Sequence, residues 1–495
     1  MKKIIRNRKK DIYAYVGIFL SIIITFFIIY SIGVEDNVAM IETVMIYSIL
    51  IIICISIYMT RNSVHKINSI IKMVIIIGII MRIGYMLYTP CNIRSHDLWG
   101  FDKSLGGHSG YIMYILDGSL PDSNFRQYYH PPLFYALSAF MIKIINPILK
   151  EQEMLKIIDI AKIVSCTASC YVLMLTYKIS KEIKLGDIGQ LLAVTIIAFL
   201  PNFYLLAGRV NNDSLAIFFM VLAILYTIKW YREVNVKNTV VLAMAFGFGM
   251  MTKISVSVIA IFTGIVMLIK GYNYLKNRQI KTILLNYLLF GIIALPLGLW
   301  YPMRNLIKFK QPFNYVLDIN APNSAIYCGN HSIIDRLFKI PFSKMFKDIY
   351  NNPFGDYNIT IYSIKSALFG EFKFDVPSIL PRVLLGIFII FNIFVIISLC
   401  ITIKSKVKNK SILIAYIANM ILQIGAFISF NIRYPYGCTM DYRYIVPTAI
   451  FNALLIGYTS TILEGRAKAY KIYNYIACVI IVTFSIFSIV MYTEI

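Results

Sequence analysis

The sequence predicts an all-α, polytopic membrane protein, and three observations support this class. The 495-residue chain is 59% hydrophobic and has a mean hydropathy of +0.71, well above the values of soluble globular proteins. Apolar runs of about 18 residues or more recur along the whole chain, and each is long enough to cross the hydrocarbon core of a bilayer. The net charge of +24 gathers in short loops between these runs, where Lys and Arg set orientation, so it does not indicate a nucleic-acid partner.

The N-terminal region, 1–67, is expected to hold two transmembrane helices that precede the main module. Its basic start, MKKIIRNRKK, leads into a long apolar run without a small-residue cleavage site. This pattern predicts a retained first span and a cytoplasmic N-terminus. The two spans lie near 12–33 and 40–59, and a third near 68–89 brings the chain to the external face.

The apolar segment 132–148 decides the orientation of everything that follows. If it crossed the bilayer, five later loops that carry 17 Lys and Arg residues would be external. If it lies along the outer surface, all five loops are cytoplasmic, as the positive-inside rule prefers. Pro147 and Lys143 are compatible with a helix at the interface. We therefore expect this segment to belong to an external loop over 90–156.

The remaining apolar runs complete a predicted total of about thirteen transmembrane helices in the cell (plasma) membrane. They divide the rest of the chain into a membrane module over 68–301, an external loop region over 302–378 and C-terminal spans over 379–495. The predicted spans lie near 157–177, 187–207, 213–230, 238–251, 254–269, 283–301, 379–403, 411–430, 444–464 and 472–492.

Residues 90–135 form an unusually polar stretch between two apolar regions. It contains His96, His108 and His130, three of the five histidines of the chain, together with several aspartates that include Asp97 and Asp102. His130 precedes two prolines, which impose an extended conformation on it and give its imidazole a fixed direction. So many titratable groups in one loop predict a functional site at the external face.

The predicted topology brings further charged residues to this face. A carboxylate there could take a proton from an acceptor hydroxyl. Cations could neutralise a departing phosphate, whose negative charge grows in the transition state. The set therefore suits a reaction between a nucleophile and a membrane-bound phosphate ester. Its other members are Asp213, Lys253, Arg304, Arg433, Asp441 and Arg443.

Seven short motifs follow one another within 68–465. An acidic motif opens the first large loop, and a Gly-rich, Tyr-Ile segment with a Gly-x-Leu-Pro turn follows it. Next come a basic residue before Pro-Pro-Leu, an Asn-Asp-Ser-Leu-Ala, a Met-Thr-Lys, an aromatic-x-x-Arg-Asn and an Arg-Tyr-x-x-Pro. They occupy 94–97, 107–112 with 118–121, 130–133, 212–216, 251–253, 301–305 and 443–447. Their order resembles the GT-C superfamily of membrane glycosyltransferases, in the protein-mannosyltransferase and aminoarabinose-transferase branch (glycosyltransferase family 39 and relatives).

This resemblance implies a GT-C-like fold and an inverting transfer of a sugar from a polyprenyl phosphate to a glycan, lipid or protein acceptor. Asp97 is the expected general base and Asp102 the alternative. A divalent ion held by Asp97, His108 or His130 would suit carboxylate and imidazole ligands, although no residue spacing requires such a cofactor. The residues expected to bind the substrate or its phosphate are His130, Lys253, Arg304, Asp213, Arg443 and His108.

The chain departs from the family pattern in two respects, and the candidate residues also have structural interpretations. Two extra spans come first, and His96-Asp97 stands where Asp-Glu is commoner, which leaves the identity of the base open. The aspartates could cap helices, and Lys253 could extend to the interface.

Two other functions fit part of the pattern. A secondary transporter of an anionic solute should place charges near the membrane midplane in both halves, whereas here they gather at one face. A polysaccharide polymerase or ligase would use a large external loop with paired arginines late in the chain, and 302–378 keeps this alternative open.

Overall fold

Helices form nearly all of the regular structure in a computed structural model that describes residues 2–61, 63, 66–313, 315–317, 323–405 and 410–494. Within these residues, β-pairing is limited to one isolated bridge between Tyr327 and Tyr436. An all-helical chain is the outcome expected in lipid, because a helix satisfies its backbone hydrogen bonds internally. The predicted all-α fold class is confirmed.

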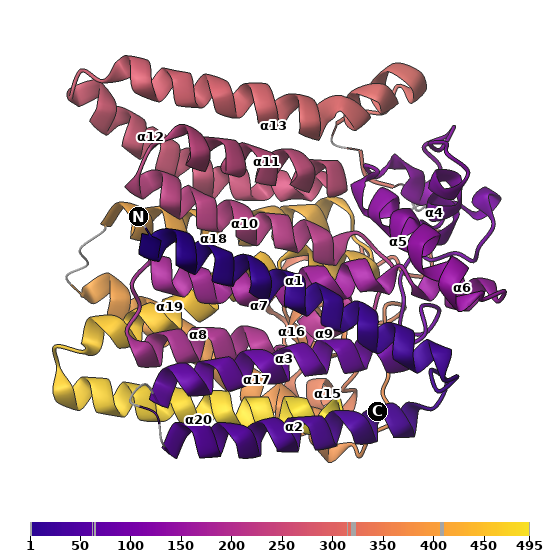
Figure 1. Cartoon of the computed structure of the whole chain (residues 1–495), viewed down its shortest axis with the longest axis horizontal. Coiled ribbons are helices and arrows are strands. Elements are labelled where there is room, and N and C mark those ends of the chain that lie inside the picture. The colour runs from indigo at the N-terminus through magenta and orange to yellow at the C-terminus, as the bar shows by residue number, and fades with distance from the viewer. Residues whose placement is uncertain are drawn as a thin grey trace.

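The long helices lie side by side along one direction, and the connecting segments gather at the two ends of the bundle (Figure 1). Ten segments among the described residues are long and apolar enough to cross a membrane. They involve α1 (Lys2–Ser31), α2 (Val38–Arg61), α3 (Lys66–Tyr88), α6 (Met154–Asp159) with α7 (Lys162–Glu182), α10 (Asp213–Arg232), η3 (Ile254–Ile259) with α12 (Ala260–Lys276), α13 (Ile280–Phe309), α17 (Ile379–Lys404), α18 (Lys410–Arg433) and α20 (Ala467–Met491).

Three of the thirteen predicted spans coincide with shorter helices. They are α8 (Asp187–Phe199), α11 (Val236–Thr252) and α19 (Pro447–Leu463), with 13, 17 and 17 residues. A 13-residue helix rises about 20 Å, which is less than the roughly 30 Å of a hydrocarbon core. The count of thirteen therefore stays a prediction, while a multi-pass membrane protein is established.

Helices α8 and α19 touch backbone to backbone. A Cβ atom on Gly189 would lie 2.4 Å from the carbonyl oxygen of Gly457, and one on Gly457 would lie 2.4 Å from that of Gly189. No other residue fits either position without moving a helix, as at other small-residue contacts between membrane helices. The two glycines therefore set the distance between these helices.

A fully buried arginine joins three helices inside the bundle. Arg82 of α3 donates hydrogen bonds to Ser169 Oγ of α7 at 3.0 Å and to the carbonyl oxygens of Ile197 and Ala198 of α8 at 2.8 and 3.0 Å. A charge within a membrane protein is a functional candidate by default. These partners give Arg82 a structural role instead.

The segment between α3 and α7 begins and ends at the same end of the bundle. Lys162, at the start of α7, donates to the carbonyl oxygens of Met86 and Thr89 at 3.0 and 2.8 Å, at the end of α3. Helix α5 (Leu133–Leu149) lies in this segment and exposes Phe140 and Ile148 on one side. Such a helix lies along the bundle end without a net crossing, in keeping with the predicted interfacial segment 132–148. We call this end of the bundle the site face.

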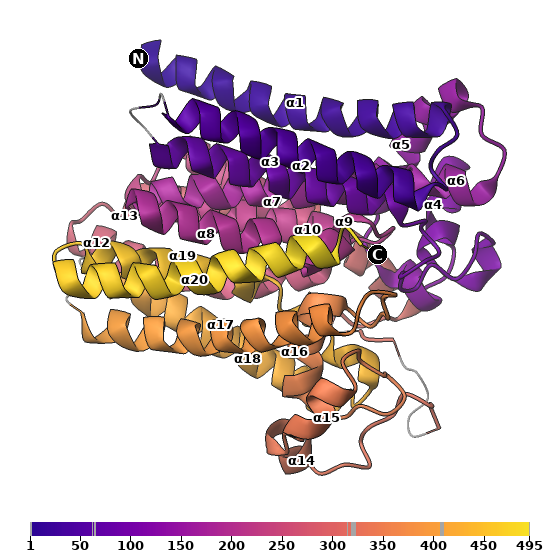
Figure 2. The same cartoon turned by 90° about the horizontal axis from the view of Figure 1, so that it is seen from below.

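Several short helices lie at the site face or beside the bundle next to it (Figure 2). They lie in the loops after α3, α8, α13 and α18, and they position the polar residues described below. Their bounds are α4 (His108–Leu116), α9 (Asn202–Ala207), α14 (Ile333–Phe338), α15 (Phe342–Lys347) and α16 (Ile359–Phe369), with η1 (Lys103–Leu105), η2 (Arg126–Tyr129), η4 (Gly437–Met440) and η5 (Tyr442–Tyr444).

Candidate functional site

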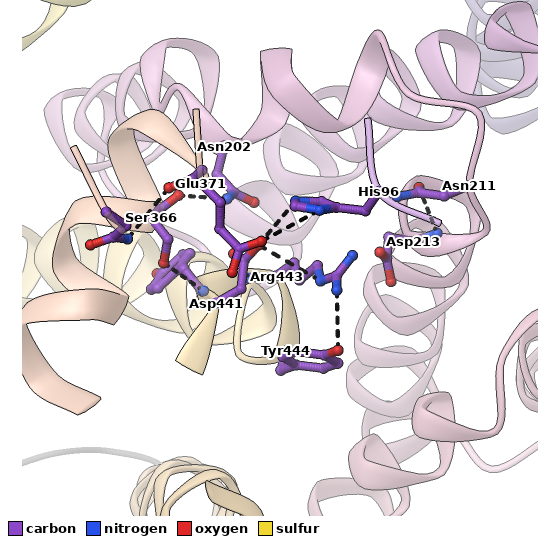
Figure 3. A network of polar contacts seen from close by, with 12 residues as sticks. His96, Asn202, Asn211, Asp213, Ser366, Glu371, Asp441, Arg443 and Tyr444 are labelled. Carbon is purple, nitrogen blue, oxygen red and sulfur yellow. Dashed lines mark hydrogen bonds and ion pairs between the residues drawn. The ribbon is translucent and has the colours of Figure 1, made fainter. Parts of the chain in front are cut away.

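Three distant segments bring four charged or titratable side chains together at the site face (Figure 3). His96 lies between two carboxylates, with Nδ1 3.4 Å from Glu371 Oε2 and Nε2 3.7 Å from Asp441 Oδ2. Arg443 Nε lies 3.7 Å from the same oxygen of Asp441. These residues come from the loop after α3, the segment after α16 and the loop before α19. We call His96, Glu371, Asp441 and Arg443 the central cluster.

The loop that carries His96 and Asp97 has a constrained backbone. Asp97 has a φ of 60°, a left-handed conformation that a non-glycine residue keeps only when its surroundings hold it. The His108 N–H donates to the Asp97 carbonyl oxygen at 3.0 Å, and Ser109 Oγ donates to Leu98 at 2.8 Å. A Cβ on Gly107 would lie 1.9 Å from the Leu98 carbonyl oxygen, so only glycine fits there. The start of α4 therefore fixes the position of Asp97.

Arg443 is the cation that several carboxylates share. Its own N–H donates to Asp441 Oδ1 at 3.0 Å, and its guanidinium donates to the Tyr444 hydroxyl at 3.3 Å. Burial alone would lower the pKa of Arg443, but Tyr444, Asp441, Asp213 and Asp97 together raise this pKa well above its ordinary value. Half-buried Asp97 thus acts on the same guanidinium as the central cluster.

An ion pair between two helices adjoins the central cluster. Lys253 Nζ, at the end of α11, lies 2.5 Å from Asp213 Oδ1, at the start of α10. Asn212 Nδ2 donates to the Thr252 carbonyl oxygen at 3.1 Å and ties the same two helix ends together. Lys253 Nζ also lies 5.6 Å from the centre of the Tyr444 ring. The pair is therefore continuous with the segment that carries Arg443.

His108 and His130 form a neutral part of this region. Their rings are stacked with centroids 6.1 Å apart, and His108 Nδ1 lies 2.8 Å from the Tyr135 hydroxyl oxygen. Burial lowers the pKa of His108 to about 4, although Asp97 and Asp213 oppose the change. Burial, and then Lys253, lower the pKa of His130 well below its ordinary value. Both imidazoles are uncharged at neutral pH, so His130 could contact a phosphate only as a neutral donor.

Two candidate residues lie apart from the central cluster in the described part of the chain. Arg304 donates to Asn305 Oδ1 at 2.9 Å and to the Pro121 carbonyl oxygen at 2.5 Å, which fastens the end of α13 to the loop after α4. Asp102 is exposed, and its carboxylate accepts a hydrogen bond from the Ser104 N–H at 2.6 Å as the cap of η1. Both contacts indicate structural roles.

Two residues that sequence reasoning did not select belong to the region. Glu371 accepts a hydrogen bond from the Tyr362 hydroxyl, and burial, followed by Asp441, raises its pKa to about 7. Arg209 is 3% exposed, lies 4.8 Å from the centre of the Phe372 ring and interacts electrostatically with Asp441 and Arg443. Glu371 stands in the long loop after α13, where neither charge nor periodicity marks it.

The central cluster also contains the one set of possible metal ligands found among the described residues. His96, Glu371 and Asp441 offer ligand atoms that all lie within 4.8 Å of one another. Carboxylate and imidazole ligands suit Mn or Zn. Arg443 and Arg209 act on the same carboxylates and already balance part of their charge. The other proposed ligands, Asp97, His108 and His130, do not form such a group in the residues described.

Comparisons with known proteins find one family match over part of the chain and loosely similar solved structures. Residues 129–300 match the family model for dolichyl-phosphate-mannose-protein mannosyltransferase, whereas no curated protein matches the chain. A structure of the Archaeoglobus fulgidus oligosaccharyltransferase in the apo form is similar, with a TM-score of 0.48 and 11% identity over 87% of this chain and 56% of that one. A structure of ArnT from Cupriavidus metallidurans in the apo state has a TM-score of 0.39 and 11% identity over 86% of this chain and 77% of that one.

The present chain thus spans little more than half the length of the archaeal enzyme. Similarity at these TM-scores is loose and carries no assignment of function, and the family match covers residues 129–300 only. That match, over residues 129–300, supports the predicted resemblance to membrane glycosyltransferases of the GT-C type.

Proposed function

We propose that this protein transfers a sugar from a polyprenyl phosphate to an acceptor hydroxyl on the external face of the plasma membrane, with inversion at the anomeric carbon. The observation that carries the proposal is the position of the buried Arg443, whose Nε lies 3.7 Å from Asp441 Oδ2 in a region where the carboxylates of Asp97 and Asp213 also act on it electrostatically. These residues come from loops that are far apart in the sequence and meet at one end of the helix bundle. Such a site can accept a proton and hold an anion at the membrane surface.

Asp97 is the proposed general base. It is half-buried, unlike the exposed cap Asp102, and the start of α4 fixes its backbone. Its carboxylate would take the proton of the acceptor hydroxyl while the hydroxyl oxygen forms a bond to the anomeric carbon. The bond from that carbon to the phosphate oxygen breaks on the opposite side, and its electron pair stays with the lipid phosphate.

Arg443 and Lys253 are the proposed partners of that phosphate. The ring of Tyr444 lies against both side chains, with its centre 5.1 Å from the Arg443 guanidinium and 5.6 Å from Lys253 Nζ. Guanidinium and ammonium groups that face a growing negative charge lower the energy of the transition state. Arg304 has a weaker claim, because its guanidinium already holds the loop after α4.

The experiment that tests this function is transfer by the purified protein in liposomes. A radiolabelled sugar on a polyprenyl phosphate is offered with a panel of peptide, lipid and glycan acceptors, and the anomeric configuration of the product is determined by NMR. We expect a product of inverted configuration from the lipid donor and none from a nucleotide sugar. Transfer from the nucleotide sugar, retention of configuration, or solute transport without transfer would each overturn the proposal.

A further inference from the structure

Two short helices in the loop after α13 expose large apolar side chains. Helix α14 follows its cap Ser332, α15 follows Pro341, and the loop continues to Asp356; we call residues 332–356 the paddle. Five of its apolar side chains are 51–74% exposed: Ile333, Ile334, Phe338, Phe342 and Phe354. A group of exposed apolar side chains on so short a segment indicates a surface that interacts with a membrane or with another protein.

The opposite side of the paddle packs against the rest of the protein. Leu337 of α14 joins a small hydrophobic cluster that includes Ile359 and Tyr362 of α16 and Phe427 of α18. Asn358 Nδ2 donates to the carbonyl oxygens of Asp335 and Lys339 at 3.2 and 3.0 Å. One side of the paddle is thus packed against the protein and holds it in place, while the exposed apolar residues lie on its other side.

The attachment points of the paddle lie at the ends of two membrane spans. Arg336, which is 3% exposed, donates to the Asn431 carbonyl oxygen at 2.9 Å near the end of α18. Arg382, in the first turn of α17, donates to the Phe346 carbonyl oxygen at 3.2 Å. Span ends mark the boundary between hydrocarbon and headgroups. Figure 2 shows α14 and α15 standing beside the bundle rather than beyond its end, which places them over the adjacent leaflet.

Three lysines lie at the surface of the paddle beside its exposed apolar side chains, in a segment that also carries Asp335, Asp348 and Asp356. Lys339 and Lys344 are 66% and 53% exposed, and Lys347 is exposed as well. Their carboxylate contacts, at 3.7 Å to Asp335 and 4.0 Å to Asp356, are long and lie at the surface, where ion pairs are weak. Apolar groups beside lysines are typical of elements that lie in a membrane interface and favour anionic lipids.

We propose that the paddle docks into the headgroup region of the leaflet on the site face, with its exposed Ile and Phe side chains among the upper acyl chains and its lysines at anionic headgroups. Docking would also hold the central cluster at a fixed depth. The Cys328 N–H donates to the Pro435 carbonyl oxygen, and the Gly437 N–H to that of Ile326, both at 2.8 Å. These bonds join the base of the paddle to the loop that carries Asp441 and Arg443.

Depth-dependent quenching in liposomes tests this docking on the whole protein. In a background with the exposed cysteines replaced (Cys54→Ala and Cys400→Ala), Phe338→Cys is labelled with an environment-sensitive fluorophore. We expect quenching by lipids that carry a spin label on the upper acyl chain, with more quenching when phosphatidylglycerol is present. The matched control is Ser119→Cys, in an exposed turn after α4, which should respond to aqueous iodide instead.

Two further variants separate docking from misfolding. Adding Ile334→Asp to the labelled protein should abolish quenching by the lipids while the protein stays inserted. The triple change of Lys339, Lys344 and Lys347 to Glu should remove the effect of phosphatidylglycerol and leave the protein folded. A label at position 338 that responds to iodide as the control does would overturn the proposal. Protection of that label from both quenchers would overturn it too, because a protein partner would then cover the paddle.

Discussion

Asp97 is the residue whose chemistry the proposed mechanism requires most directly. Asp97→Asn keeps the size of the side chain but removes its ability to accept a proton. General-base assistance is typically worth about 10²–10⁴-fold, so transfer should fall by that order while binding of the lipid donor persists. Turnover and donor binding measured separately in liposomes check this.

The matched control for the base is Asp102→Asn. Asp102 caps η1 at the surface, and asparagine caps a helix about as well as aspartate does, so this variant should keep both its stability and its turnover. If the Asp102 variant is inactive and the Asp97 variant is active, the roles of the two carboxylates are reversed.

Arg443 and Lys253 allow a test of the phosphate contacts. A charge-assisted contact contributes about 1.5–3 kcal/mol, so Lys253→Ala and Arg443→Ala should lower kcat/KM for the lipid donor by roughly 10- to 150-fold. Arg443→Lys keeps the buried charge and should recover part of the loss. Arg304→Ala is the contrasting variant, because it should lower the thermal unfolding temperature more than kcat/KM. Equal kcat/KM for all four proteins and the parent would place the phosphate elsewhere.

Glu371 gives the site a pH dependence of defined sign. Burial and Asp441 raise its pKa to about 7, so the folded state favours its protonated form. The stability linked to this proton is fully present below the ordinary pKa of a glutamate and is lost as the pH rises through about 7. Relative to Glu371→Gln, the parent protein should lose at most about 3 kcal/mol between pH 4.5 and 8.

Thermal unfolding of the purified protein across this pH range measures that difference. Glu464→Gln, in an exposed loop, is the control that should keep the slope of the parent. A parent and a Glu371→Gln variant with the same slope would contradict the assignment of the proton to Glu371.

Sequence reasoning reached some members of the site region and not others, for a physical reason. Residues such as Asp97 and Asp213 stand beside apolar runs in short motifs, so their position relative to the membrane follows from hydropathy. Glu371 and Arg209 enter the region only because α16 and α9 pack under the loop before α19. Contacts of this kind depend on tertiary structure, which no local pattern in one sequence encodes.

At the scale of elements, α5 determines which loops share a face. Helix α5 returns the chain to the end of the bundle where α3 stops, so positions 123 and 237 should lie on opposite sides of the membrane. In the background without exposed cysteines, Ser123→Cys should react with an impermeant thiol reagent in intact cells. Lys237→Cys, two residues after Asn235, should react only after permeabilisation. The reverse pattern would mean that 132–148 crosses the bilayer.

The lengths of elements explain which of them the sequence predicts well. Long spans such as α17 and α20 contain so many consecutive apolar residues that their composition alone predicts them. The short α8 does not stand out by length, and it is stable because its neighbours cover it: Leu192, Val194 and Ile197 are all buried. Elements such as α14 and α15, with six residues each, carry no usable periodicity.

At the scale of the whole molecule, the charged groups proposed for catalysis meet at one end of the bundle. This one-sided position of the charged groups agrees with an enzyme that works at a membrane surface, and it differs from the midplane sites of transporters.

The N-terminal pair α1 and α2 is peripheral, with 11% and 17% of the span windows buried compared with 61% for α3. Near the site face, Lys156 Nζ binds Glu35 Oε1 at 2.7 Å and the Tyr30 hydroxyl donates to Asp159 Oδ2 at 2.6 Å.

The contact between Gly189 and Gly457 has a consequence for how a lipid donor could enter. Two helices that touch backbone to backbone cannot slide or part without losing that contact, so α8 and α19 should move as one body. Two arginines of the site should keep their positions together with this pair of helices. Arg209 follows α8 and α9 in the chain, and Arg443 comes just before α19. Any movement that opens the proposed site to a polyprenyl chain is therefore expected in elements outside the α8–α19 pair.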